Sequence, residues 1–156
     1  MAVEMIRLLL ALILVFAVVV AAYGQADAVC SISATPIVFG TYDVLNKTPT
    51  DTTGAIIYRC QGRDQNITIT LDRGGAPSFA TRLMLSGSNQ LLYNLFMDAA
   101  RTVIWGDGTG GTQLLFVRNP QPNNQNINVP VYGRIPALQD VRVGNYTNTI
   151  IATINF

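Results

Sequence analysis

Two cysteines are the residues of this chain best suited to covalent chemistry. Cys30 and Cys60 are the only cysteines among 156 residues, and there is no histidine. An even number of cysteines in an exported chain favours a disulfide, here closing a loop of about 30 residues, whereas two buried free thiols would suit a cytosolic protein better. Two thiols without histidine are too few ligands for a zinc site. We therefore expect a disulfide between Cys30 and Cys60 and no metal.

Catalysis has little support in the sequence. Without histidine, neither a Ser-His-Asp nor a Cys-His arrangement can be built. Carboxylates could work in pairs, as Asp98 with Asp107 or Asp43 with Asp72, but each of these residues stands where turns commonly use Asp. We expect a protein that is not an enzyme.

A glycine-rich run at residues 106–111 resembles a phosphate or calcium loop only superficially. It lacks the Gly-Lys-Ser/Thr ending of a P-loop, and Asp107 is its only carboxylate. We expect a turn and no cofactor. The chain has 10 Lys and Arg against 9 Asp and Glu, so its net charge of +1 gives no reason to expect nucleic acid as a partner.

The start of the chain has the pattern of a secretory signal. Arg7 precedes an unbroken apolar run over residues 8–22, which is shorter than the span of about 20 residues that a bilayer requires. Small residues offer cleavage after Gly24, giving a signal over 1–24, or after Ala28. An uncleaved anchor is the alternative, but no basic stop-transfer cluster follows. Residues 25–156 then form one domain of ordinary size.

The rest of the chain alternates like strands, and no long window has a helical period. Ile67, Ile69 and Leu71 should face inward from one strand. Pro130 should mark an edge or bulged strand. Polar loops are expected at 46–53 and 118–128. The predicted strands are 29–34, 55–60, 66–72, 82–86, 90–97, 103–105, 114–117, 129–135 and 147–156. Short strands at this spacing indicate an all-β sandwich.

The last predicted strand, residues 147–156, has an apolar inward face and no returning partner after it. No charged residue or proline interrupts it. Such an edge invites a strand from another chain by β-augmentation. The inward residues that would form one wall of an acceptor groove are Tyr146, Ile150, Ala152, Ile154 and Phe156.

Several motifs together resemble one family over essentially the whole mature chain. They are CSISATP at 30–36 with FGTYD at 39–43, YNLFMDAART at 93–102, WGDGTG at 105–110, VYGRIP at 131–136 and GNYTNT at 144–149. On these motifs the chain closely resembles the spore coat protein U domain family, the subunits of archaic (Csu-type) chaperone-usher pili.

This resemblance implies an incomplete immunoglobulin-like sandwich that lacks its final strand and is completed by a donor strand in trans. The implied partners are a periplasmic pilus chaperone, an outer-membrane usher and other pilus subunits. The implied route is export through the periplasm to the cell surface, with a role in attachment and biofilm formation. A secreted spore-coat or extracellular matrix protein of the same fold that does not polymerise is the alternative.

One departure from the family pattern suggests a position in the fibre. Shaft subunits carry a donor extension ahead of the first cysteine, whereas here at most residues 25–29 precede Cys30. We therefore expect a subunit that accepts a strand without giving one, which fits the distal tip. Candidates for binding at a tip are Phe79, Trp105, Leu114, Leu115 and Phe116, although the core is the favoured place for most of them.

Overall fold

The described part of the chain is built entirely from strands and loops. The computed structural model describes residues 29–62, 66–120 and 124–156. The predicted signal segment, 1–24 or 1–28, lies outside these residues. The described residues contain eight strands and no helix, and so none that could cross a membrane. The all-β prediction is confirmed.

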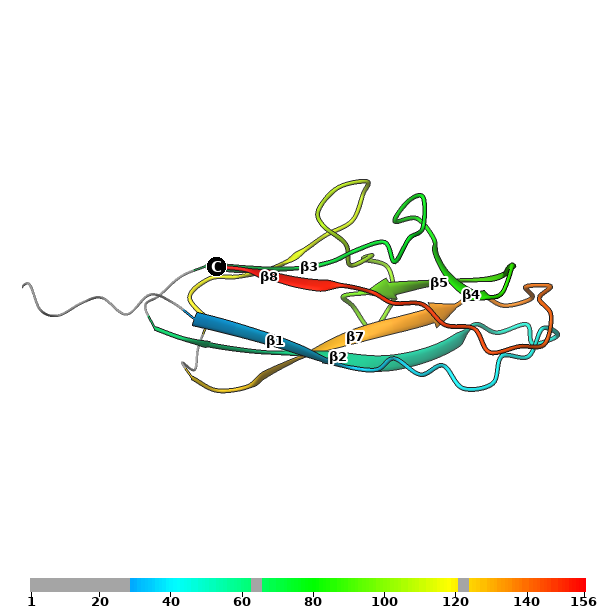
Figure 1. Cartoon of the computed structure of the whole chain (residues 1–156), viewed down its shortest axis with the longest axis horizontal. Helices are drawn as coiled ribbons and strands as arrows, with labels where there is room; N and C mark the ends of the chain where they lie inside the picture. Colours follow the sequence, from blue (N-terminus) through cyan, green and yellow to red (C-terminus); the bar gives the residue numbers. More distant parts are fainter. Residues whose placement is uncertain (1–28, 63–65, 121–123) are drawn as a thin grey trace, which may run out of the picture.

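The strands form two antiparallel sheets that pack as a sandwich, with β3 and β8 over β1 and β2 (Figure 1). The larger sheet has the order β1 (Val29–Thr35), β2 (Thr50–Gln61), β7 (Ile127–Ile135), β5 (Asn89–Phe96) and β4 (Arg82–Ser86). The smaller sheet has the order β6 (Leu115–Val117), β3 (Ile67–Leu71) and β8 (Ala152–Asn155). Strands β1 and β8 therefore each end a sheet.

The core follows from period-two alternation along the strands. Ile67 and Ile69 in β3 have no exposed surface, and Leu71 is also buried, as the sequence predicted. Trp105 is fully buried too, and its indole Nε1 donates a hydrogen bond to the Ile69 carbonyl at 3.0 Å. A bond from the indole to a strand carbonyl satisfies the one polar atom that Trp105 brings into the core.

Arg82, at the start of β4, is a fully buried cation. Its Nη1 donates to Asn94 Oδ1 at 2.6 Å, its Nη2 to the carbonyls of Asp72 and Trp105, and its Nε to the Asp72 carbonyl. The ring of Phe79 lies 5.6 Å from the guanidinium carbon. Burial lowers the pKa of Arg82. Such a charge is tolerated inside because hydrogen bonds replace the lost water.

Three predicted boundaries were wrong because tertiary pairing outweighs local polarity. The predicted loop at 46–53 ends early, since β2 begins at Thr50, which pairs with Ile135 of β7. Likewise β7 begins at Ile127, inside the predicted loop at 118–128. The predicted strand at 103–105 is reduced to isolated bridges, Ile104 with Phe96 and Trp105 with Gln113.

The strand that contains Pro130 is also not an edge strand, contrary to the prediction. Strand β7 lies between β2 and β5 in the sheet. Pro130 pairs with Ala55 of β2, but β5 pairs only with residues 132–134. In the described structure Pro130 therefore has a ladder neighbour on one side alone, where its missing N–H can be tolerated.

Candidate binding groove

A groove runs along the flank where the two sheets end. One wall is the end of β1 and the segment after it, and the other wall is residues 146–152, which lead into β8. The hollow between them has a volume of about 440 Å³. Its lining comprises Ala34, Thr35, Pro36, Ile37, Phe39, Ala55, Ile56, Leu71, Met84, Tyr93, Leu95, Val131, Tyr146, Thr147, Asn148, Thr149, Ile150 and Ala152. The floor is thus the core of the sandwich itself.

Two glycines position the first wall. Pro36 ends β1, and the half-buried side chains of Ile37 and Phe39 then pack down onto β2 and β7. A Cβ at Gly54 would lie 2.5 Å from Ile37 Cγ1, and one at Gly133 would lie 2.7 Å from Phe39 Cζ. Only glycine permits this close approach. After Thr35, this wall therefore packs on the large sheet through its side chains and is not paired with a neighbouring strand.

The second wall differs from the ten-residue strand predicted at 147–156. Thr147 pairs with Leu85 of β4, whereas β8 pairs with β3 and covers only residues 152–155. The chain crosses from one sheet to the other between these pairings, so a continuous ladder cannot form. The Asp72 carboxylate instead accepts a hydrogen bond from the Ile151 amide at 2.9 Å. The segment keeps period two without being a regular strand.

The five residues predicted for this wall are divided by that crossing. Tyr146, Ile150 and Ala152 line the groove. Ile154 packs against the core but lies outside the hollow. Phe156 is 51% exposed and also lies outside the hollow. The inward residues of this wall are half-buried because the core covers them on one side and the open groove leaves them exposed on the other.

A second hollow, of about 740 Å³, continues the groove toward the loops at 40–45 and 141–145. It shares Ile37, Phe39, Met84, Tyr146 and Thr147 with the first hollow. Its floor adds Leu91 and Ile135 from the large sheet. At the opposite end, Cα atoms of β1 and β8 come within 8 Å of one another. The groove is therefore wide at the loop end and narrow at the disulfide end.

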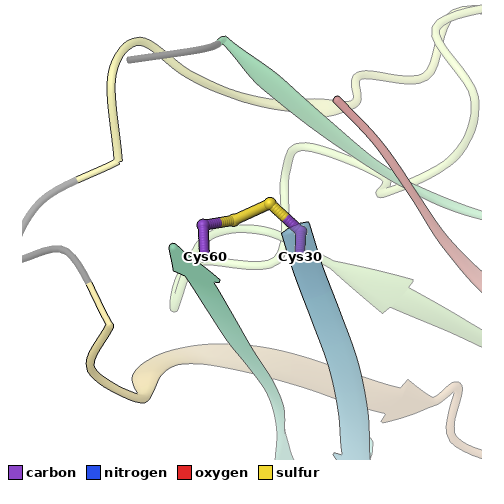
Figure 2. Close-up of a disulfide and its surroundings, with 2 residues drawn as sticks. All are labelled: Cys30 and Cys60. Carbon is purple, nitrogen blue, oxygen red and sulfur yellow. A yellow bond between two sulfur atoms is a disulfide. The ribbon is translucent and has the colours of Figure 1, made fainter. Parts of the chain in front are cut away.

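The disulfide fixes the narrow end. Cys30 of β1 and Cys60 of β2 face each other in the antiparallel register and are joined by a disulfide (Figure 2). No free cysteine remains in the described chain. Because β1 has only β2 beside it in the described sheet, the bond ties an edge strand to its single neighbour.

Two polar residues that line this groove, Tyr93 and Asn148, were not predicted from the sequence. Asn148 lies on the inward face, between Tyr146 and Ile150, and its Nδ2 donates to the Tyr93 hydroxyl at 3.1 Å. The Tyr93 ring packs edge-on against Phe39, with 5.9 Å between ring centroids. Burial raises the pKa of Tyr93, which therefore stays protonated near neutral pH. Asn148 is two residues after Tyr146, so period two places both on the same face, and this spacing could have predicted that Asn148 points inward.

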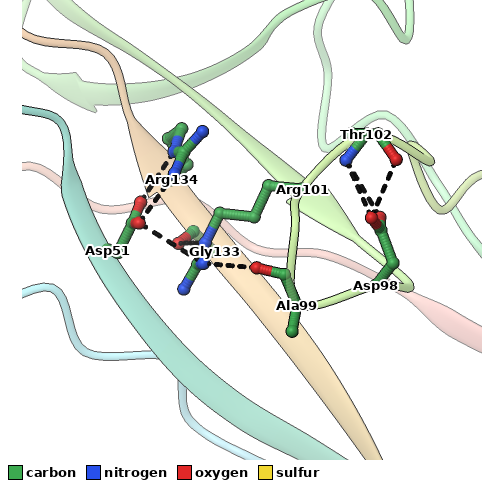
Figure 3. Close-up of polar contacts among 7 residues, drawn as sticks. All are labelled: Asp51, Asp98, Ala99, Arg101, Thr102, Gly133 and Arg134. Atoms are coloured by element: carbon green, nitrogen blue, oxygen red, sulfur yellow. Dashed lines mark hydrogen bonds and ion pairs between the residues drawn. The ribbon is translucent and has the colours of Figure 1, made fainter.

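The carboxylates considered for catalysis act as local acceptors in turns. Asp98 accepts a hydrogen bond from the Thr102 amide (Figure 3). It also accepts one from the Val103 amide, which is the main reason that its pKa is lowered. The Thr109 hydroxyl likewise lowers the pKa of Asp107. Asp43 accepts from the Leu45 amide, as Asp72 does from Gly74. For Asp98 and Asp107, these bonds favour the ionised form, which accepts hydrogen bonds, over the protonated form that a general acid needs.

The other predicted contact residues also fall mainly into the core. Phe79 and Trp105 are buried, and Leu114 and Leu115 are half-buried. Phe116 is 54% exposed. Of the five apolar candidates for tip binding, Phe116 alone offers most of its side chain to solvent. Among the described residues, no group of three or more Cys, Asp or Glu could hold a metal.

A charged cluster occupies the large sheet where the turn at 98–102 meets β2 and β7. The Asp51 carboxylate accepts two hydrogen bonds from Arg134 at 2.8 Å and lies 3.3 Å from Arg101 Nη1 (Figure 3). Arg101 has a φ of 59°, and its Nε donates to the Gly133 carbonyl. These contacts hold a non-glycine residue in the left-handed region, which costs energy without such support.

The fold and the groove together define an immunoglobulin-like sandwich of two antiparallel sheets that leaves one flank uncovered. The chain belongs to the spore coat protein U domain family, whose model matches residues 15–153. The family predicted from the motifs is therefore confirmed. Protein U of Myxococcus xanthus is 33% identical over 131 residues, which are 76% of this chain and 70% of that protein.

A solved structure shares the fold. It is a chain of the CsuC–CsuE chaperone–tip adhesion subunit pre-assembly complex from the archaic chaperone-usher Csu pili of Acinetobacter baumannii, with a TM-score of 0.53 and 21% identity. The match covers 83% of this chain and spans 40% of that chain's length. The likeness supports the immunoglobulin-like sandwich that the sequence predicted.

Proposed function

We propose that this chain is a structural and adhesive subunit of a chaperone-usher pilus, and that it accepts a donor strand in the groove between residues 34–39 and 146–152. The observation that carries the proposal is the groove itself. One wall is the edge of the large sheet at β1, and the other is the segment that crosses from β4 of that sheet to β3 of the smaller sheet. The floor consists of buried core residues such as Ile56, Leu71 and Val131. A strand laid there would pair with both edges and complete the sandwich.

The energetics favour completion by another chain. Four or five apolar donor side chains, each worth about 1.5–3 kcal/mol when buried, would add about 6–15 kcal/mol. The whole stability of a domain is of about the same size, 5–15 kcal/mol. The isolated subunit should therefore be only marginally stable, and a donor strand should stabilise it strongly.

The partners in this proposal are a periplasmic chaperone, an outer-membrane usher and other pilus subunits, and the route is export to the cell surface. The similar solved structure contains a chaperone bound to a tip adhesion subunit, which supports the chaperone and the tip position. Surface attachment and biofilm formation would follow from it.

A secreted coat or matrix protein is the second candidate, favoured by the family description and by the identity with Protein U. A coat protein of this fold need not polymerise by strand exchange. Genes for a periplasmic chaperone and an usher beside this gene would support the pilus, and their absence would support the coat.

Strand exchange tests the proposal. The subunit would be purified with its chaperone and mixed with synthetic N-terminal extensions of neighbouring subunits. We expect the peptide to displace the chaperone and the melting temperature to rise. Donation of a strand by this chain would overturn the tip position. A free monomer that melts cooperatively and is unchanged by any donor strand would overturn the function.

A further inference from the structure

The inward face of the groove is largely apolar but has one polar point, while Thr35, Thr147 and Thr149, which also line the hollow, are exposed. The Tyr93 hydroxyl and the Asn148 amide meet there at 3.1 Å, and both residues line the hollow. Their inward neighbours are Tyr146 and Ile150 along the wall and Met84 and Leu95 on the floor. Tyr93 keeps only 4% of its surface exposed, whereas Asn148 is half-buried.

This pair has unused hydrogen-bonding capacity. A tyrosine hydroxyl can both accept and donate, and an amide has two donors and an acceptor oxygen. Among the described residues, the bond between Asn148 Nδ2 and the Tyr93 hydroxyl is the only side-chain hydrogen bond that either residue makes. In the open groove, water can satisfy the Tyr93 O–H and Asn148 Oδ1. Any strand that covers the groove removes this water.

The cost of covering the pair depends on the side chain above it. An aliphatic side chain would leave a buried O–H and a buried amide oxygen without partners, which is unfavourable. A serine, threonine or asparagine could donate to Asn148 Oδ1 or accept from Tyr93. At inward positions that face only apolar side chains, the same hydroxyl would be penalised, because it would lose its water without gaining a partner. The groove therefore favours a polar donor side chain at one position and apolar donor side chains at the others.

We propose that the strand which fills this groove carries a hydrogen-bonding side chain, Ser, Thr or Asn, at the one inward position that faces Tyr93 and Asn148, and aliphatic side chains at its other inward positions. This inference rests on the proposed function, because it concerns the donor strand. It assigns Tyr93 and Asn148 as the residues that select the donor sequence and its register.

An isosteric scan tests the inference. The chain would be extended after Phe156 by a short Gly/Ser linker and a strand of about nine residues with valine at every inward position. Each inward valine would then be changed to threonine in turn, which adds a hydroxyl at nearly constant volume. We expect one threonine to raise the melting temperature by about 3 °C or more relative to the all-valine strand, and each of the others to lower it.

Tyr93→Phe identifies the cause of the preference. It removes only the hydroxyl, so the favoured threonine should lose most of its advantage. Tyr58→Phe is the matched control, because Tyr58 is also 4% exposed and also has a pKa raised by burial, yet it does not line the groove. The threonine preference should persist in that variant.

The possible failures can be told apart. If the all-valine strand stabilises the chain but every threonine destabilises it, the inference is overturned and the acceptor function stands. A preference that survives Tyr93→Phe and Asn148→Leu unchanged also overturns the inference. If the all-valine strand gives no more stability than the linker alone, the acceptor function fails, and the inference fails with it.

Discussion

The interior around Arg82 and the groove beside residues 146–152 are built from the same strands but are covered to different degrees. Asn94 of β5 completes the hydrogen bonds of a fully buried guanidinium, whereas the adjacent Tyr93 lines the open hollow. In the first region every buried polar side-chain atom has a partner. In the second region, apolar surface and hydrogen-bonding groups have no strand over them. The difference shows that the open flank is a local feature of a sandwich whose interior is otherwise packed and hydrogen-bonded.

Removing the Arg82 side chain should have the largest effect of a single substitution. Arg82→Met would leave the carbonyls of Asp72 and Trp105 without the Arg82 donor, and Asn94 Oδ1 would keep only the bond from the Leu95 amide. We expect a loss of about 3–5 kcal/mol in the free energy of unfolding, measured by urea denaturation of the chain stabilised by a tethered donor strand. Arg59→Met is the control, since Arg59 is exposed and bonds only Asn124 among the described residues. Equal effects of the two changes would argue against the buried network.

Loss of the disulfide should have the second largest effect on stability, and it should loosen β1 at the edge of the groove. Replacing Cys30 and Cys60 together by serine frees a loop of 30 residues in the unfolded chain. The chain-entropy estimate gives a loss of about 3–4 kcal/mol in the free energy of unfolding. Reduction of the wild-type chain should reproduce it in the same denaturation measurement. A loss below about 1 kcal/mol would mean that β1 is held without the bond.

Truncating one residue in each region sharpens the comparison further. Ile150→Ala should cost about 1 kcal/mol in the isolated chain, because Ile150 is half-buried, and about 2–3 kcal/mol once a tethered strand covers it. Ile69→Ala, in the closed core, is the control and should cost about the same with and without the strand. If the strand changed both costs equally, it would not be seated in the groove.

The charged cluster at Asp51 should give the smallest effect and a defined pH dependence. The hydrogen bond from Arg134 lowers the pKa of Asp51 in the folded chain, with the Arg101 charge contributing. Ionised Asp51 therefore stabilises the fold above the unfolded pKa of about 4, and this contribution is lost as the pH falls through the lowered value.

Asp51→Asn should accordingly cost no more than about 0.5–1 kcal/mol at pH 7, because the side chain is 34% exposed and water screens the pair. The difference between variant and wild type should shrink in unfolding measurements toward pH 3. A difference that grew on acidification would contradict this assignment.

The fold could be predicted from the sequence because apolar and polar residues alternate clearly in the strongest strands. The pattern Ile67, Ile69 and Leu71 was enough to place β3 with its inward face. It failed where distant partners decide the outcome. Thr50 is a strand residue because Ile135 pairs with it. Arg82 is buried because three acceptors surround it and take four hydrogen bonds, and neither fact is visible locally.

The candidate groove was predicted in part for the same reason. Period two put Tyr146, Ile150 and Ala152 on one face, and all three line the hollow, although the segment between them is irregular extended chain. The strand itself was too long in the prediction because Thr147 pairs with Leu85 of the other sheet. Asn148 was overlooked because a polar residue on an apolar face gains its meaning only from Tyr93, which is distant in the sequence.

Amide hydrogen exchange tests the central claim most directly, because a donor strand must pair with both walls of the groove. The exchange rates of the chain alone would be compared with those of the chain carrying a tethered strand of alternating valines. We predict that added protection concentrates in residues 34–39 and 146–152, while the turn at 98–102 is unchanged. Protection absent from these two segments, or spread evenly over the chain, would contradict the account.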